Sequence, residues 1–242
     1  MKLRFLTAGD RGLMVELGDE VDLAINRRVH ALARLIQAED IAGVEELIPT
    51  YRSILVIYDP LILPYDELVE RIRGLATEEA SSAQVRTVTL PTCYGGEFGP
   101  DLEDVARHNG LTTQEVIDIH TSRGYPVFCL GFSPGFPYLG GMSERIAMPR
   151  LENPRTKVPA GSVGIAGTQT GVYPSETPGG WRIIGRTPVR LYLPERDPPV
   201  LLRPGDVVRF RAIDEEEYRE IARLERDGRY EPEIAYGGGE GE

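Results

Sequence analysis

The chain has 242 residues, of which 41% are hydrophobic and 27% charged, and its formal net charge is −11 at pH 7. This length can hold one large β-rich domain or two smaller ones, and the negative charge argues against a nucleic-acid partner. No apolar run approaches the roughly 18 residues of a membrane-spanning helix. The first residues, MKLRFLTAGDRGLMVELGD, place charges and glycines where a signal peptide needs an apolar core, so we expect a cytoplasmic protein without a membrane partner.

The cysteines and histidines predict neither disulfides nor a metal site. Cys93 and Cys129 show no CxxC spacing, which fits a reducing compartment. Cys129 lies inside the apolar run YPVFCLGF, and a buried thiol is favoured there over a nucleophile. The three histidines are far apart in the sequence, at His30, His108 and His120. We therefore expect no metal centre.

Residues 1–80 predict a small α+β domain. The segments KLRFLTA and GLMVELG alternate as paired strands, and Asp19 is expected to cap a helix that follows. One face of this helix is apolar, at Ile25, Val29, Leu32 and Ile36. GVEELIPT and YRSILVIYD predict two more strands, and Pro64 opens a second helix. TEEASSAQ, residues 77–84, has no aliphatic side chain larger than alanine and is the expected linker.

Residues 85–213 predict a β-rich domain. After the strand VRTVTLP, one helix is expected between Pro100 and Gly110, and the pair Thr112 and Glu115 predicts a capping box for another through His120. Further strands are expected at YPVFCLGF, RIIG, VRLYL and DVVRFRAI. Many short strands separated by turns are typical of a barrel or a sandwich. Residues 214–242 predict a terminal helix, DEEEYREIARLERD, followed by a mobile tail.

The segment from Gly131 to Arg186 combines turn residues with large apolar ones. Between Gly131 and Gly185 there are 11 glycines and 7 prolines, a density that is common in disordered chains. The same segment carries Phe136, Tyr173 and Trp181, more apolar surface than a solvated linker tolerates. We therefore expect fixed turns between short strands, which shape a surface.

Several chemistries can be compared with this segment. Neither GxxxxGK[ST] nor GxGxxG occurs, so no ordinary phosphate loop is present. Ser133 lies in GFSPG, which is similar to a nucleophile elbow, but Pro134 lacks the N–H that an oxyanion hole uses. Gln169 and Tyr173 suit an amide or a small polar ligand, although each could equally satisfy turn carbonyls. His120 could be a general base, but a packed or exposed helix residue is favoured.

Long motifs resemble one known family. They are GFSPGFPYLGGM and PRLENPRTKVPAGSVGIAGTQTGVYPSETPGGWRIIGRTPVRLY, with LTAGDRGLMVELGD, YRSILVIYDP and PTCYGGEFGPDLEDVA before them. This sequence resembles the family known as allophanate hydrolase subunit 1, kinase A inhibitor or the B subunit of 5-oxoprolinase. The resemblance covers nearly the whole chain, with small departures such as Val172 where isoleucine is usual. It implies an N-terminal α+β domain followed by a cyclophilin-like β-barrel.

The resemblance also implies an activity and partners. It implies the B subunit of an ATP-dependent 5-oxoprolinase, which opens 5-oxo-L-proline to L-glutamate with ATP and Mg. The implied partners are a larger polypeptide of related barrel fold, of the type of the 5-oxoprolinase C subunit, and a LamB/YcsF-like protein, the A subunit. Two alternatives remain within the family: an inhibitor that binds a sporulation-type histidine kinase, and, ranked lowest, allophanate hydrolase subunit 1.

Under this resemblance the glycine-rich segment would be one face of a composite active site, and the isolated chain would be nearly inert. Cations would surround phosphate, and neutral donors would surround a developing oxyanion. The candidate catalytic residues are Arg155, Lys157, Gln169 and Tyr173. The candidate binding residues are Phe132, Ser133, Phe136, Arg150, Ser162, Gly164, Gly167, Thr170, Trp181, Arg182 and Arg186.

Overall fold

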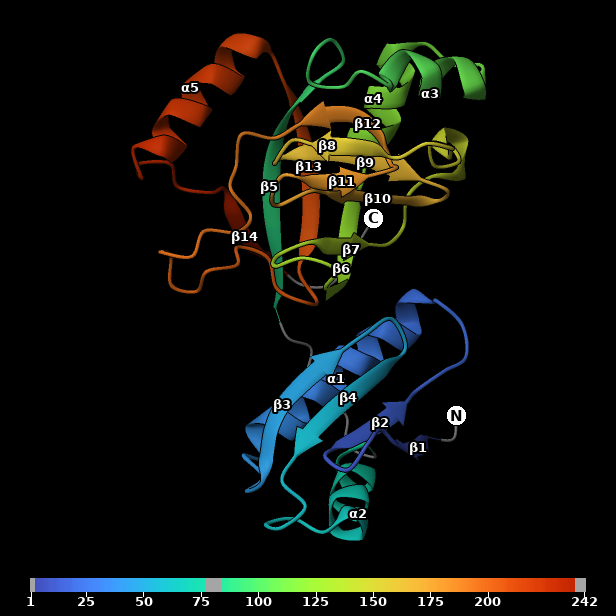
Figure 1. The fold of residues 1–242 in the computed structure, drawn as a ribbon, viewed down its shortest axis with the longest axis vertical. Helices are drawn as coiled ribbons and strands as arrows, with labels where there is room; N and C mark the ends of the chain where they lie inside the picture. Colours follow the sequence, from blue (N-terminus) through green and yellow to red (C-terminus); the bar gives the residue numbers. More distant parts are fainter. Residues whose placement is uncertain (1–2, 77–83, 238–242) are drawn as a thin grey trace. The chain divides into compact units, whose positions relative to one another are not determined.

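The computed structural model describes residues 3–76 and 84–237. The chain divides into two compact units, Met1–Ala83 and Gln84–Glu242, and each is described by itself (Figure 1). Nearly all of the expected linker, residues 77–83, lies outside the described residues.

The N-terminal unit is a sheet whose one face is packed against two helices. Its strands pair antiparallel in the order β1-β2-β4-β3. Alternate strand residues such as Leu13, Val15 and Val56 are fully buried and share one core with both helices. The elements are β1 (Arg4–Thr7), β2 (Gly12–Glu16), α1 (Leu23–Ala38), β3 (Val44–Pro49), β4 (Ser53–Tyr58) and α2 (Tyr65–Leu75).

The expected helix cap at Asp19 is wrong. The cap is Asp22, whose backbone is extended and whose carboxylate accepts the N–H of Ile25. Because α1 begins at Leu23, only a side chain directly before it can reach the open N–H groups of the first turn. Asp19 lies three residues too early.

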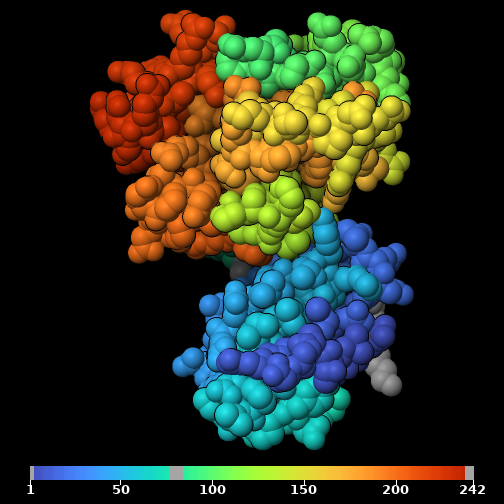
Figure 2. All heavy atoms as spheres, in the orientation of Figure 1, coloured from blue at the N-terminus to red at the C-terminus, as the bar shows by residue number. Residues whose placement is uncertain are grey.

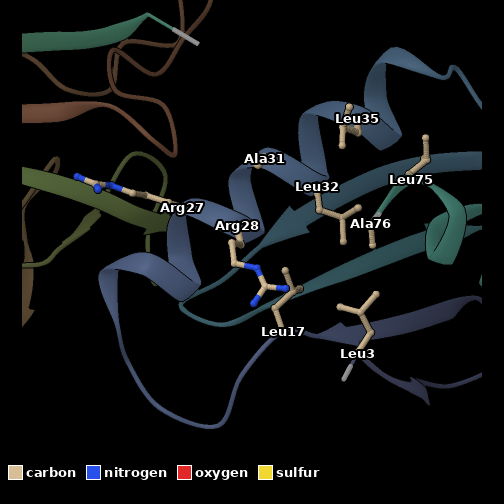
Figure 3. Close-up of a pocket in the computed structure, with 9 residues that line it drawn as sticks. All are labelled: Leu3, Leu17, Arg27, Arg28, Ala31, Leu32, Leu35, Leu75 and Ala76. Carbon is tan, nitrogen blue, oxygen red and sulfur yellow. The ribbon is translucent and has the colours of Figure 1, made fainter. Parts of the chain in front are cut away.

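A hollow of about 310 Å³ lies beside α1 in this unit (Figure 3). Most of its lining is aliphatic, including Leu17, Leu32 and Leu35, and Arg28 extends beside Leu17. Leu3 and Ala76, which also line it, are the described residues next to 1–2 and 77–83.

The C-terminal unit is built on a closed barrel. Its strands follow the order β12-β9-β10-β7-β6-β13-β5, and β12 pairs again with β5 through Gly185–Tyr94 and Arg186–Cys93, which closes the ring. The pair β5 and β13 is parallel. The barrel strands are β5 (Val85–Tyr94), β6 (Gly124–Leu130), β7 (Pro137–Leu139), β9 (Ser162–Ala166), β10 (Gln169–Val172), β12 (Arg182–Arg186) and β13 (Val207–Ile213).

Two helices follow β5, and both begin and end as the sequence predicts. α3 (Leu102–Asn109) ends at Gly110, which has φ +66°, the conformation that glycine adopts without strain. α4 (Thr113–Thr121) begins with a complete capping box between Thr112 and Glu115. A short 3₁₀ turn, η1 (Glu144–Ile146), lies near both helices.

The expected mobile tail is wrong for residues 234–237. After α5 (Glu215–Arg226), the chain forms β14 (Ile234–Gly237), which pairs antiparallel with residues 85–88 of β5. β12 covers this edge of β5 only at Cys93 and Tyr94, so the rest of the edge offers unpaired backbone groups that β14 satisfies. Residues 238–242 lie outside the described residues.

The expected strand VRLYL is also wrong. In residues 189–193 Tyr192 forms an isolated bridge with Val200, while Val189 and Leu191 are buried in the barrel core. The N–H of Leu201 donates to the carbonyl of Leu191 at 2.8 Å, and the guanidinium of Arg196 also donates to the carbonyls of Arg190 and Leu191. Strand-like pairing is limited to this short stretch. The alternating apolar pattern therefore reflects burial of a loop.

Candidate functional site

The glycine-rich segment wraps a second, smaller core on the outer surface of the barrel. The two-stranded antiparallel sheet of β8 (Arg155–Val158) and β11 (Thr177–Gly179) belongs to this layer and pairs apart from the barrel sheet. The members of the cluster, which we call the outer core, are Phe136, Val158, Ala166, Tyr173, Trp181 and Ile183. Figure 2 shows this face of the C-terminal unit, where the loop after β6 (lime) and residues near β8 (yellow) both reach the surface.

Two of the predicted site residues, Gly164 and Trp181, have a packing role in the outer core. Gly164 and Gly171 are directly opposite each other on β9 and β10. A Cβ at Gly164 would lie 3.1 Å from Cβ of Trp181, and one at Gly171 would lie 3.0 Å from its Cζ3. Both contacts are too close for relaxed carbon atoms. The glycines therefore leave the space that the indole ring fills.

Phe136 and Tyr173 complete this packing. Their rings meet edge to face at 5.6 Å, and Phe136 meets Trp181 at 5.7 Å. Burial raises the pKa of the Tyr173 phenol, so this side chain is held neutral. The phenol oxygen also occupies the place where a side chain at Gly179 would lie. Tyr173 is thus a neutral group inside the outer core.

Arg155 holds the outer core to the barrel. Its Nη2 donates to Oδ1 of Asp101 at 2.7 Å, and Oδ2 of the same carboxylate accepts the N–H of Ile183 at 2.6 Å. Asp101 is 4% exposed and directly precedes α3. The carboxylate therefore joins the start of α3, β12 and β8. Asp101 was missed by sequence reasoning, although its place after Pro100 was the available signal.

The remaining cations have varied surroundings. Lys157 is exposed and pairs with Glu176 at 2.9 Å. Arg150 is exposed and lies over the ring of Trp181, 5.9 Å from its centroid. Nε of Arg182 donates to the carbonyl of Pro149 at 3.3 Å. Among the candidates, Arg150 and Arg182 therefore keep a guanidinium at the surface beside the outer core.

Arg186 lies apart from these two, on the side of β12 that faces Phe98. Its guanidinium carbon lies 5.7 Å from the Phe98 ring centroid, and its Nε is buried without a hydrogen-bond partner among the described residues. Ser162, which is directly opposite Arg186 in the strand pairing, likewise has a buried hydroxyl without a partner in the described chain. Two unused polar atoms therefore lie on neighbouring strands.

Thr170 lies inside the barrel, in a buried chain of polar groups. Its hydroxyl donates to the carbonyl of Gly164 at 3.2 Å and lies 2.9 Å from Nε2 of His120, while Nδ1 of His120 lies 2.8 Å from the Tyr94 hydroxyl. Since the threonine proton is used, Nε2–H of His120 must donate and Nδ1 must accept from Tyr94. Burial lowers the pKa of His120 to about 3. The histidine is a neutral structural group.

The turns of the segment carry the last candidates. Gly167 has φ +58° at the β9–β10 turn, two residues before Gln169, which is half-buried where β10 begins. Phe132 is 69% exposed with φ +64°, and Ser133 follows it with a buried hydroxyl that no described residue binds. Phe132, Arg150, Gln169 and Arg182 are thus predicted residues whose side chains remain accessible, as does that of Lys157 in its ion pair with Glu176.

The accessible residues do not enclose a nucleotide. Arg155 and Lys157, the nearest cations in sequence, each already bind a carboxylate. A hollow of about 560 Å³ lies in this unit between α5 and the loop after β12, and none of these candidates lines it. Within the described residues, no group of three or more His, Cys, Asp or Glu is placed to hold a metal ion.

The chain is similar to a carboxyltransferase domain family and to 5-oxoprolinase B subunits. Residues 3–202 match the family described as carboxyltransferase domain, subdomain C and D. The chain is 48% identical over 222 residues to the 5-oxoprolinase B subunit of Bacillus subtilis, a match that covers 87% of this chain and 92% of that protein. None of the described helices is both long and apolar enough to span a membrane.

Solved structures show the same fold. TTHA0988 superposes with a TM-score of 0.76 at 38% identity, over 84% of this chain but 40% of that longer chain. PH0987 from Pyrococcus horikoshii is 51% identical, with a TM-score of 0.54 over 89% of this chain and 100% of that one. The fold therefore occurs both as a chain of this length and as part of a longer polypeptide.

Proposed function

Since the chain belongs to the family of the carboxyltransferase domain, subdomains C and D, we propose that it is the B subunit of a multi-subunit, ATP-dependent 5-oxoprolinase. The complex would convert 5-oxo-L-proline, ATP and water to L-glutamate, ADP and phosphate. The observation that carries this proposal is the 48% identity to a 5-oxoprolinase B subunit over 92% of that protein's length.

The geometry supports a contributing role for this chain. Its accessible candidates are a polar amide, two guanidinium groups and an aromatic ring on one segment, at Gln169, Arg150, Arg182 and Phe132. Amide and guanidinium groups can orient a lactam or its carboxylate. Because these side chains lie at the surface and none of them lines the hollow beside α5, we propose that a second polypeptide completes the site.

The proposed partners are a larger polypeptide of related barrel fold and a LamB/YcsF-like protein. ATP and Mg belong to the assembled complex in this proposal, and the setting is the cytoplasm. Gln169 is proposed to contact the substrate. Arg155 is proposed as a positioning residue, because its contact with Asp101 fixes the strand β8 that carries it.

The test is reconstitution of the three-part complex. ADP release and L-glutamate formation should both depend on 5-oxo-L-proline and on the presence of all three parts, and this chain alone should release no ADP. Gln169→Ala should lower kcat about 10-fold or more, the usual cost of a lost polar contact in a transition state. Arg107→Ala is the control, because this exposed arginine of α3 pairs only locally with Asp104.

Two results would contradict the proposal. If ADP release by the complete complex does not respond to 5-oxo-L-proline, the proposed activity is refuted. A Gln169→Ala complex as active as the Arg107→Ala complex would remove Gln169 from the site and leave the activity in place.

A further inference from the structure

The loop that joins β6 to β7 has a defined and unusual backbone. The N–H of Ser133 donates to the carbonyl of Gly131 at 2.7 Å, so Phe132 is the centre of a γ-turn, and its φ of +64° makes it the rare, strained kind. A β-turn follows, closed by the N–H of Phe136 and the carbonyl of Ser133 at 3.0 Å. Its inner residues, Pro134 and Gly135 with φ +80°, are typical of a type II turn.

Phenylalanine is a poor residue for this position. Among the described residues, the non-glycine residues with positive φ are Asp40 and Phe132. Aspartate tolerates this conformation, whereas a bulky side chain there is strained. Phe132 is also 69% exposed, so its ring recovers little free energy by burial in this chain. Strain held at an exposed aromatic residue indicates a role outside the stability of the fold.

The surroundings hold this ring in place. Phe132 meets Phe136 edge to face at 5.6 Å, and Phe136 is 3% exposed within the outer core. The hydrogen bond from Gly131 N–H to the Phe136 carbonyl, 3.1 Å, closes the base of the loop. The ring is therefore displayed on a fixed support, which lowers the entropy that binding would cost. The buried Ser133 hydroxyl beside it has no partner among the described residues.

We infer that Phe132 is an anchor that inserts into an apolar pocket of a second polypeptide chain. This second chain is the counterpart of the rest of TTHA0988. TTHA0988 is a longer polypeptide, and the present chain matches 40% of it. A rigid exposed aromatic residue is the usual centre of such an interface. The inference rests on the proposed function for the partner's identity and adds the residue that binds it.

Arg150 indicates the charge that the partner carries at the edge of the interface. Its guanidinium is exposed over Trp181, in the outer core that also supports Phe136. Arginine beside an aromatic anchor favours a partner surface with carboxylates around its pocket. The partner surface is therefore apolar at its centre and acidic at its edge.

The experiment measures binding between the full-length chain and the separately expressed counterpart of the remaining part of TTHA0988, by titration calorimetry. Phe132→Ala and Phe132→Gly should both weaken binding about 30-fold, the size of a hot-spot loss. The glycine variant should nevertheless melt about 2–4 °C above the alanine variant, because it alone relieves the positive φ. Leu61→Ala is the matched control, since Leu61 is apolar and 94% exposed but not among the positive-φ residues, and its affinity should stay within about twofold.

Three outcomes would overturn the inference. The first is unchanged affinity of Phe132→Ala, and the second is a loss equal to that of Leu61→Ala. The third is a Phe132→Ala variant that binds the partner normally but no longer associates with itself, as measured by light scattering. ADP release by the wild-type complex is measured separately. A complex that is inactive but whose formation still depends on Phe132 would refute the proposed activity and support the role of Phe132 in binding.

Discussion

The buried neutral His120 predicts a specific loss of stability in acid. His120 is fully buried, and its ring nitrogens are both used, Nε2 toward Thr170 and Nδ1 toward Tyr94. Protonation at Nδ1 would break the hydrogen bond from Tyr94, and burial alone lowers the pKa of the imidazole to about 3. In the unfolded chain the same imidazole has a pKa of about 6.5.

The folded and unfolded pKa values of His120 determine how the free energy of unfolding changes with pH. Between pH 6.5 and 3 the unfolded chain binds a proton that the folded chain does not, so the free energy of unfolding falls as the pH falls through this window. The loss is about 1.4 kcal/mol per pH unit, or roughly 2 kcal/mol between pH 6.5 and pH 5. The contribution of the histidine to the pH dependence fades above pH 6.5 and is nearly absent one pH unit higher.

Urea titrations between pH 7 and pH 5 measure this loss. The chain has one tryptophan, and Trp181 is buried in the outer core of the C-terminal unit, so its fluorescence reports unfolding of that unit. His120→Gln removes the titrating group, while the carboxylates titrate in both proteins. The fall in stability between pH 6.5 and pH 5 should be smaller in the variant by roughly the 2 kcal/mol given above. Parallel pH profiles of the two proteins would refute the assignment of a neutral buried imidazole.

Three further substitutions test the packing of the site. Gly171→Ala should destabilise the C-terminal unit by about 1–3 kcal/mol, because its Cβ would meet the ring of Trp181 at 3.0 Å; an unchanged urea midpoint would contradict this. Asp101→Ala should cost about 2–4 kcal/mol, because it leaves Arg155 without its carboxylate, and a small change in the thermal melt would show that the contact is dispensable. Lys157→Ala should change stability by less than about 0.5 kcal/mol, since its ion pair is exposed; a larger shift in melting temperature would count against a surface role.

Local signals in the sequence predicted most of the elements. The capping box at Thr112 and Glu115 and the stop at Gly110 depend on residues within one helical turn of each other, so they could be identified without tertiary structure. The prediction of a strand at VRLYL failed because its backbone pairing is limited to an isolated bridge of Tyr192 with Val200, while the nearby Arg196 guanidinium binds carbonyls of the loop. Alternation shows which side chains are buried and leaves the backbone partners unspecified.

The site was predicted as a segment, and the roles within it depended on long-range contacts. Arg155 and Asp101 are 54 residues apart, and no spacing rule connects them. Gly164 and Trp181 fit a ligand surface and a packing role equally well until the strand pairing placed the indole against the glycine. The sequence shows only that residue 164 is glycine, and the side chain that requires it, Trp181, comes from the far end of the segment.

Phe136 links the packing of the outer core to the position of the exposed Phe132 ring. Phe136 contacts Phe132 on one side and Trp181 on the other, so the position of the exposed ring depends on the same outer core that the glycines shape. A substitution that loosens the core without touching the surface, such as Gly171→Ala, should therefore also weaken partner binding, because the anchor would lose its fixed support. The glycine density that first resembled disorder then has a mechanical reason: it lets large aromatic rings approach the barrel closely enough to hold a strained loop rigid.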